Sequence, residues 1–166
     1  PDLEFGWSNQ VTVGDWSINA FFRGAVGHSL VNTFRAFYEP VVGTQSSYNF
    51  VNTDLKVDGL TSAQFSSLYV EKADFFKLDN LTIARRFNFG SGSTISGLTV
   101  SLTGQNLFVL TSYTGTDPEP ALVDYGAADN GGVVNFNAPD VLSPGIDRRY
   151  NYFASRSFTL GVNLNF

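Results

Sequence analysis

Apolar and polar residues alternate over several short segments of this chain, and this period of two constrains the fold more than any other feature. Alternation of this kind predicts β-strands with one apolar and one polar face, because successive side chains of a strand point to opposite faces. The last segment is the most regular, and its apolar positions are Phe158, Leu160, Val162, Leu164 and Phe166. Together the alternating segments predict strands near 3–13, 16–27, 79–89, 98–108 and 157–166.

The connections between these predicted strands alternate between short and long. Gly14-Asp15 is a two-residue hairpin signal, and the Gly/Ser-rich stretch 90–97 predicts a second turn. The connections near 28–78 and 109–156 are long and rich in Gly, Pro, Asn and Asp. Short turns on one side and long extracellular loops on the other are typical of outer-membrane barrels. A compact soluble domain rarely contains two such long irregular connections.

Composition favours strands over helices. The 166 residues include 16 Phe, 7 Tyr and 16 Gly, and no run reaches the roughly 18 apolar residues of a membrane helix. If the chain crosses a bilayer, it must therefore do so with strands. A net charge of −5 argues against a nucleic-acid partner. The sequence has no methionine and no export signal, so we expect it to be part of a longer protein.

Alternation alone does not separate a membrane barrel from a soluble β-sandwich, whose sheets also have one buried and one solvated face. The polar faces here carry small uncharged Ser, Thr, Asn and Gln, which suits a wet barrel interior. Aromatic residues are plentiful near strand ends, as an interfacial girdle requires. Arg85 lies on an apolar face near a turn, where its stem could reach the lipid headgroups. A secreted carbohydrate-binding β-sandwich is the alternative.

The sequence carries no recognised catalytic or cofactor motif. It has no GxSxG, GxGxxG, Walker or HExxH pattern and no cysteine. His28 is the only histidine. A catalytic or metal site that used it would need other residue types as partners, and the sequence does not place any beside it. We expect a protein that is not an enzyme and that holds no cofactor or metal.

The long connections contain the residues most suited to contact a ligand or partner. Exposed aromatic side chains can stack on sugars or pack against a protein lid, although packing between loops is an equal alternative. Asp147, with the two arginines that follow it, could also pin the base of the second loop through ion pairs. The candidate loop contacts are Tyr69, Tyr113, Asp117, Glu119, Tyr125, Arg148 and Arg149.

Three blocks of sequence resemble the SusC/RagA family of TonB-dependent transporters. The first is YVEKADFFKLDNLTI at 69–83, the second GQNLFVLTSYTGTDPEP at 104–120, and the third PGIDRRY at 144–150. They occur in the family's order, whereas the first sixty residues match more loosely. The family usually has Tyr-Pro before its last strand, where this chain has Tyr152-Phe153. The terminal Phe166, with apolar residues at every second position before it, also resembles the signal read by the barrel-assembly machinery.

The resemblance implies an all-β, antiparallel transmembrane barrel of 22 strands, of which this chain supplies about the last five. It further implies an outer-membrane protein of a Bacteroidetes-type Gram-negative bacterium that imports an oligosaccharide or peptide. The expected partners are the remainder of the same barrel, a SusD-like surface lipoprotein, TonB through an absent N-terminal part, and outer-membrane lipid.

Overall fold

The computed structural model describes residues 1–40, 50–57, 59, 66–90, 92–120, 144–148 and 153–166. The chain divides into two compact units. The first, which we call the sheet unit, consists of Pro1–Gly27, Asp74–Thr111 and Ala154–Phe166. The second, the loop unit, consists of His28–Ala73 and Ser112–Phe153. Each unit is therefore assembled from segments that are distant in the sequence.

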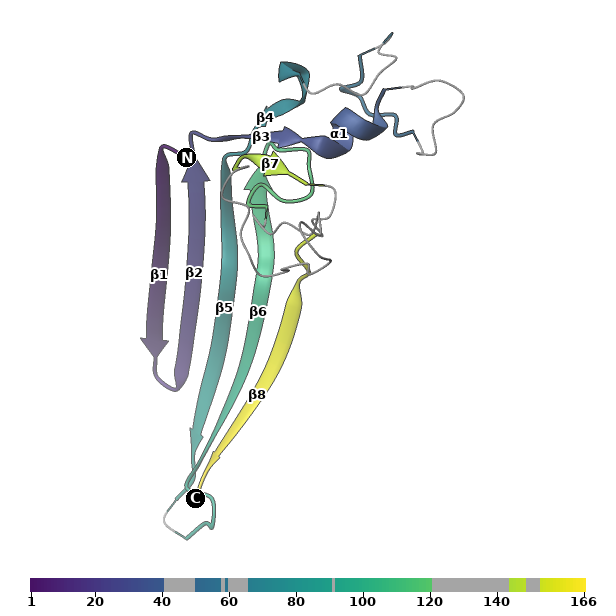
Figure 1. Ribbon diagram of the computed structural model, residues 1–166. Helices are drawn as coiled ribbons and strands as arrows, with labels where there is room; N and C mark the ends of the chain where they lie inside the picture. The colour runs from purple at the N-terminus through teal and green to yellow at the C-terminus, as the bar shows by residue number, and fades with distance from the viewer. Residues whose placement is uncertain (41–49, 58, 60–65, 91, 121–143, 149–152) are drawn as a thin grey trace, which may run out of the picture. The chain divides into compact units, whose positions relative to one another are not determined.

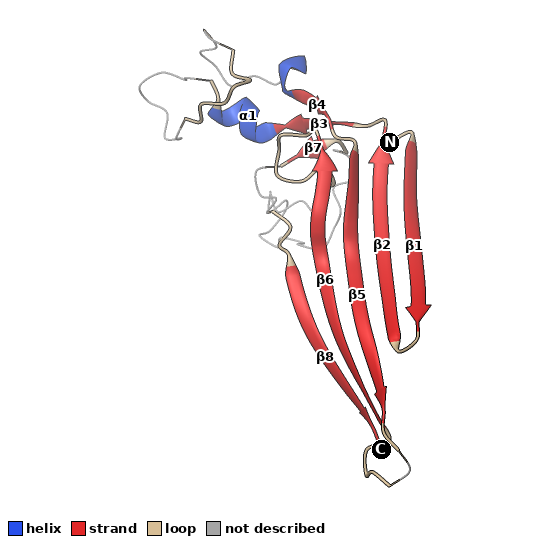
Figure 2. Cartoon of the chain, turned by 180° about the vertical axis from the view of Figure 1, so that it is seen from behind, coloured by secondary structure: helices blue, strands red, loops and turns tan. Residues whose placement is uncertain are grey.

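The sheet unit is a single antiparallel sheet of five strands in the order β1-β2-β5-β6-β8 (Figures 1 and 2). The strands are β1 (Leu3–Val13), β2 (Trp16–Val26), β5 (Phe75–Asn88), β6 (Gly97–Thr111) and β8 (Ser157–Asn165). Each strand pairs with the next of the set, so β1 and β8 are edge strands with one partner each. The predicted antiparallel all-β architecture is thereby confirmed.

Both short turns lie at the same end of this sheet (Figure 1). In the first, Val13 pairs with Trp16, and Gly14 adopts a φ of 58°, which glycine tolerates without a steric penalty. In the second, the backbone N–H of Phe89 donates to the carbonyl of Ser96 at 3.1 Å. The long connections leave from the opposite strand ends, since Phe75 pairs with both Ala25 and Thr111.

A bulge explains why β5 and β6 are longer than the alternation indicates. β5 begins at Phe75 rather than near 79, and β6 continues to Thr111 rather than ending near 108. The register shifts between Leu78 and Asn80, where Asp79 faces two unpaired residues of β6. One of these, Asn106, has a left-handed φ of 52°. An inserted residue changes which positions share a face, so the period of two is lost at this point.

The loop unit contains short regular elements where the sequence predicted irregular loops. They are β3 (Ser29–Asn32), α1 (Thr33–Tyr38), the 3₁₀ helix η1 (Ser67–Tyr69), β4 (Val70–Lys72) and β7 (Ile146–Asp147). The strands form a sheet of order β4-β3-β7, with β3 antiparallel to β4 and parallel to β7. Elements of two to six residues are too short to display a hydrophobic period, which is why the sequence did not indicate them.

Within the loop unit the core is small. Leu30, Ala73 and Tyr113 form a buried apolar cluster. Asn32 caps α1, because its side-chain oxygen accepts the backbone N–H of Arg35 at 3.2 Å.

Among the residues described, no helix has the length and apolar character needed to cross a membrane.

Candidate functional site

One face of the five-stranded sheet is apolar and exposed. The pairing places Val11, Ile18, Ile83, Leu102 and Leu160 in one row across all five strands. The outer members of this row are strongly exposed, at 51% for Val11 and 69% for Leu160. A soluble protein rarely presents a continuous apolar surface of this extent. The β-sandwich alternative requires this face to be packed in a core, and its exposure argues against that alternative.

An aromatic row crosses this apolar face at the end from which the long connections leave. The rings of Trp7 and Phe22 lie 5.5 Å apart, those of Phe22 and Phe76 5.5 Å, and those of Phe76 and Phe108 6.3 Å. Phe5 also stacks on Phe76, at 6.3 Å. Aromatic side chains collect in this way at the border between hydrocarbon and headgroups.

Small uncharged polar residues dominate the other face. One row across the five strands consists of Gln10, Asn19, Thr82, Thr103 and Thr159. The hydroxyls of Thr82 and Thr103 are hydrogen-bonded at 2.9 Å. A face of this kind suits the water-filled interior of a barrel, where lipid-facing and lumen-facing residues alternate along each strand.

Charges on this polar face concentrate at the bulge. Arg23 of β2 forms an ion pair with Asp79, and the Lys77 ammonium lies 3.8 Å from the other oxygen of the same carboxylate. Because a bulge aims an extra side chain out of the regular pattern, it lets a single carboxylate meet two cations.

Four of the five predicted assembly residues lie on the exposed apolar side of β8, and the fifth, Phe166, directly follows the strand. Their exposed fractions run from 45% to 83% for Phe158, Leu160, Val162, Leu164 and Phe166. Since β8 is an edge strand, these side chains have neighbours on one side only. Their role in assembly stays a prediction.

The loop unit is organised around the buried guanidinium of Arg35. Its Nε donates to Glu39 at 2.7 Å, its Nη1 to Glu71 at 2.7 Å, and its Nη2 to the carbonyl of Leu55 at 3.1 Å. The guanidinium also lies 5.8 Å from the centre of the Tyr69 ring. Burial by itself would lower the pKa of Arg35, but the hydrogen bonds that it donates to the Glu39 and Glu71 carboxylates outweigh burial and raise the pKa. The guanidinium thus stays charged and links three separate segments.

Glu71 connects the Arg35 centre to Thr114, which lies in the second long connection of the chain. Its Oε1 accepts from Arg35 and, at 3.2 Å, from the amide of Asn32. Its Oε2 accepts the backbone N–H of Thr114 at 3.0 Å and the Thr114 hydroxyl at 2.7 Å. Burial alone would raise the pKa of Glu71, but the hydrogen bonds from Arg35 and Thr114 outweigh burial and lower the pKa. The carboxylate is therefore held in its charged form.

The structure places two of the candidate contact residues in the interior of the loop unit. Tyr69 and Tyr113 are only 2% and 6% exposed, so they pack within the loops rather than present their rings to solvent. The Tyr113 hydroxyl donates to the fully buried Asp147 at 2.7 Å, and the Thr116 N–H reaches the same oxygen at 3.2 Å. Burial and the contact with Asp147 raise the pKa of Tyr113 far above its usual range.

The remaining candidates are distributed around this interior. Asp117 and Arg148 are half-buried, whereas Glu119 is exposed and donates its backbone N–H to Asp117 at 2.9 Å. Tyr125 and Arg149 lie outside the described residues. Asp147 is tied down by Tyr113 and Thr116, so hydrogen bonds within the loop unit contribute to the anchoring that was expected from ion pairs.

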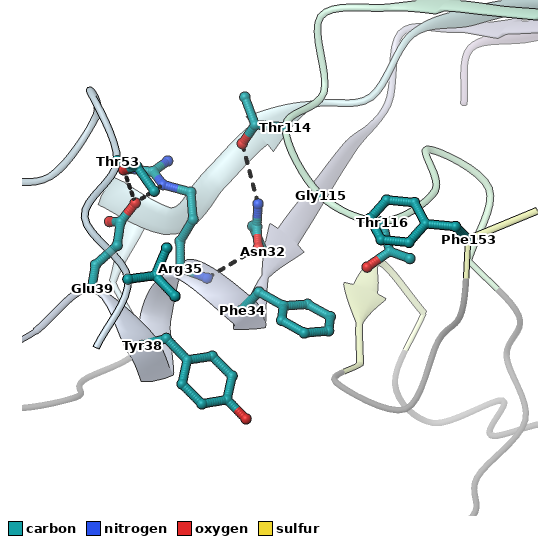
Figure 3. A pocket seen from close by; sticks show the side chains of 11 residues that line it. Asn32, Phe34, Arg35, Tyr38, Glu39, Thr53, Thr114, Gly115, Thr116 and Phe153 are labelled. Carbon is teal, nitrogen blue, oxygen red and sulfur yellow. Dashed lines mark hydrogen bonds and ion pairs between the residues drawn. The ribbon is translucent and has the colours of Figure 1, made fainter. Parts of the chain in front are cut away.

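A pocket of about 560 Å³ opens beside the Arg35 centre, within the loop unit. Figure 3 shows the rings of Phe34 and Tyr38, both from α1, below the Asn32–Thr114 hydrogen bond, with Phe153 coming from a separate segment. The lining combines apolar rings with hydroxyl, amide and charged groups, a mixture typical of ligand sites. Its residues are Asn32, Phe34, Arg35, Tyr38, Glu39, Val51, Thr53, Thr114, Gly115, Thr116 and Phe153.

This pocket was not anticipated as a unit. Phe34 and Tyr38 are four residues apart and share a face of α1, but a helix of six residues gives no readable pattern. One oxygen of the buried Glu39 carboxylate accepts from Arg35 and Thr53, while Oε2 has no hydrogen-bond partner among the described residues. In the part of the chain that the structure describes, no three acidic, His or Cys residues gather as a metal site would need.

Comparison with known proteins shows that the chain is similar to a TonB-dependent receptor and to the RagAB peptide importer. No family model matches it. It is 26% identical to the TonB-dependent receptor P3 of Formosa agariphila over 175 residues, which cover 100% of this chain and 16% of that protein. The structure of the RagAB peptide importer in its open-open state matches 98% of this chain and 17% of that one, at 23% identity and a TM-score of 0.68. A RagAB peptide transporter structure matches 68% of this chain at 28% identity and a TM-score of 0.56.

The chain spans about one sixth of the length of these relatives, with 16% of the receptor and 17% of the importer chain covered. The structural match covers nearly the whole chain and therefore includes both the strands and the long connections. The sequence match over the whole chain, the shared fold and the exposed apolar face together make this chain similar to a β-barrel segment of a SusC-like TonB-dependent transporter.

Proposed function

We propose that this chain forms part of the wall and of the external loops of an outer-membrane importer. In this proposal TonB drives the uptake of a peptide or an oligosaccharide, and a SusD-like lipoprotein acts with the barrel. The protein is a transporter rather than an enzyme. The observation that carries the proposal is the single sheet with an exposed apolar face and an uncharged polar face, which are the two surfaces that a wall between lipid and water needs.

The remainder of the barrel is a necessary partner in this proposal. Edge strands β1 and β8 each have one neighbour in the described sheet, so about half of their backbone N–H and C=O groups, those that point outward, need partners elsewhere. Hydrocarbon supplies none, and each unsatisfied group there costs several kcal/mol. Neighbouring strands of the same barrel satisfy them.

The pocket of the loop unit is the proposed contact point for cargo or lid. Peptide cargo is supported by the likeness to the RagAB peptide importer. Oligosaccharide cargo is supported by the rings of Phe34, Tyr38 and Phe153, since flat aromatic rings stack on sugar faces. Peptides and oligosaccharides are both bound through apolar contacts together with a few hydrogen bonds, and the pocket lining provides apolar rings as well as polar groups.

Uptake by the full-length transporter tests the proposal. Cells that lack the transporter are complemented with the wild type, with Phe34→Ala, or with Phe37→Ala. Phe37 is the matched control, because it is a half-buried phenylalanine of the same helix that does not line the pocket. Labelled peptide and oligosaccharide pools are supplied, with and without TonB.

We expect TonB-dependent uptake of one of the two pools and a reduction by Phe34→Ala that exceeds the effect of Phe37→Ala. Uptake that persists without TonB, or a full-length protein found outside the outer-membrane fraction, contradicts the proposed function. Equal uptake by the two variants contradicts the role of the pocket. Co-purification of a surface lipoprotein with the transporter tests the partner separately.

A further inference from the structure

Arg85 is a cation in the middle of an apolar row. The strand pairing aligns Val13, Trp16, Arg85, Val100 and Val162 across the five strands, so each in-register neighbour of Arg85 on this face is apolar. The side chain is exposed. A bare guanidinium on a lipid-facing surface is destabilising, by an amount that grows with its depth in the membrane.

Aromatic rings hold this guanidinium in place. Its central carbon lies 5.1 Å from the centre of the Trp16 ring and 4.7 Å from that of Phe87. Among the described residues its guanidinium makes no ion pair or hydrogen bond. The rings fix the plane of the guanidinium by cation–π contact but leave its N–H groups unsatisfied. Those donors are available to acceptors other than the described residues.

The position along the strand matches the level of lipid headgroups. Arg85 lies nine positions after Phe76, which belongs to the aromatic row at the other end, but the bulge at Asp79 lies between them. The paired strand β2 therefore covers the same distance in eight residues, from Gly24 to Trp16. At about 3.3 Å per residue and a tilt of about 40°, eight residues correspond to roughly 20 Å across the membrane. The apolar band of an outer-membrane barrel is about 25 Å tall. If the aromatic row marks one border of this band, Arg85 lies within about 5 Å of the other.

We propose that Arg85, flanked by Trp16 and Phe87, binds the headgroup phosphate of a phospholipid in the leaflet on the turn side of the barrel. The proposal rests on the membrane-spanning role described above. A guanidinium presents paired N–H groups in the geometry that phosphate oxygens accept. The lipid tails would then cover the neighbouring Val100 and Val162, which are apolar. In this site the guanidinium of Arg85 binds the phosphate, and the lipid tails contact the apolar surface of the two valines.

The adjacent Arg86 provides a matched control. It carries the same charge one residue further along β5, and it is also exposed, but it belongs to the polar face, where it pairs with Thr99. Arg85→Gln and Arg86→Gln therefore change the net charge equally on opposite faces of the sheet. Arg85→Leu is a second variant that keeps the outer face apolar and so favours assembly in lipid.

The experiment is native mass spectrometry of the full-length transporter, with phosphatidylglycerol and, separately, diacylglycerol of the same tails as probes. We expect Arg85→Gln and Arg85→Leu to bind phosphatidylglycerol about tenfold more weakly than the wild type, since a charge-assisted contact is lost. Arg86→Gln should bind as the wild type does. Diacylglycerol binding should be the same in all variants, and inorganic phosphate at millimolar concentration should not compete.

Each other result overturns a defined part of the reasoning. Wild-type phosphatidylglycerol binding by either Arg85 variant, or an equal loss in Arg86→Gln, contradicts the headgroup site while leaving the importer intact. Competition by inorganic phosphate indicates an anion site that does not require lipid, and also contradicts it. The absence of any bound lipid, diacylglycerol included, contradicts the membrane-spanning role itself.

Discussion

Replacing Arg35 with methionine should loosen the loop unit without altering the sheet unit. Methionine keeps most of the apolar stem but removes the three hydrogen bonds that the guanidinium donates to Glu39, Glu71 and the carbonyl of Leu55. Two carboxylates then remain buried without their cation, since the Glu39 and Glu71 side chains are only 1% and 13% exposed. This loss of a partner is the main source of the expected destabilisation.

The magnitude follows from the burial and from the contacts that survive. Removing one partner of a buried ion pair typically costs about 3–5 kcal/mol. The lower end applies here, because Thr53 still donates to Glu39 and Thr114 still donates to Glu71. A reduction of about 3 kcal/mol in the free energy of local opening corresponds to roughly a hundredfold increase in amide exchange.

Hydrogen–deuterium exchange of the full-length transporter measures this quantity. Peptides that cover 29–40 and 66–73 should exchange about a hundredfold faster in Arg35→Met, whereas peptides from the sheet unit should not change. Lys72→Met is the control, because Lys72 is an exposed cation of β4 next to Glu71. Unchanged exchange in 29–40, or an equal acceleration by Lys72→Met, would refute the claim that the Arg35 centre holds the loop unit together.

Three further predictions concern other described groups. Tyr113→Phe should destabilise the loop unit by about 1–3 kcal/mol, because the buried Asp147 loses the hydroxyl donor; exchange like that of the wild type contradicts this. The depressed pKa of Glu71 means that its charged form contributes stability above its unfolded pKa of about 4.3, and that this contribution is lost as the pH falls through the lower folded value. The difference in protection between wild type and Glu71→Gln should therefore be constant above about pH 5 and shrink below about pH 4; a difference independent of pH contradicts the assignment. Phe166→Ala should lower the amount of heat-modifiable barrel in the outer membrane, while Asn165→Ala, from the opposite face of the terminal segment, should leave it unchanged; equal amounts contradict the assembly signal.

The architecture of the sheet unit could be inferred from the sequence because its strands follow a simple rule. Where one face of a strand is apolar and the other polar, the period of two is visible along that strand. Ile18 of β2 and Leu102 of β6, for example, lie on the apolar face of their strands. The rule fails where the register shifts: around Asp79 and Asn106 the bulge changes the face on which residues fall. The start of β5 and the end of β6 therefore differed from the expected positions.

The loop unit could not be inferred in the same way, because its stability comes from contacts between distant segments. Arg35 meets Glu71 36 residues away, and Thr33 donates to the carbonyl of Asp147 114 residues away. No local period encodes such pairs. Tyr69 and Tyr113 illustrate the consequence, since a tyrosine in a long connection is equally compatible with an exposed ring and with a buried hydrogen-bonded one.

The parallel pairing of β3 with β7 has a consequence for how relatives of this protein can diverge. Val31, in the first long connection, pairs with Ile146, in the second. Asn32 and Glu71 are also both hydrogen-bonded to the Thr114 hydroxyl. Recombination that replaced only one long connection with that of another transporter would remove one partner of the β3–β7 pair and one partner of the hydrogen bonds to Thr114. Segments 28–73 and 112–153 should thus be exchanged together between related transporters. Chimeras that transfer both segments should fold, whereas chimeras that transfer only one should not.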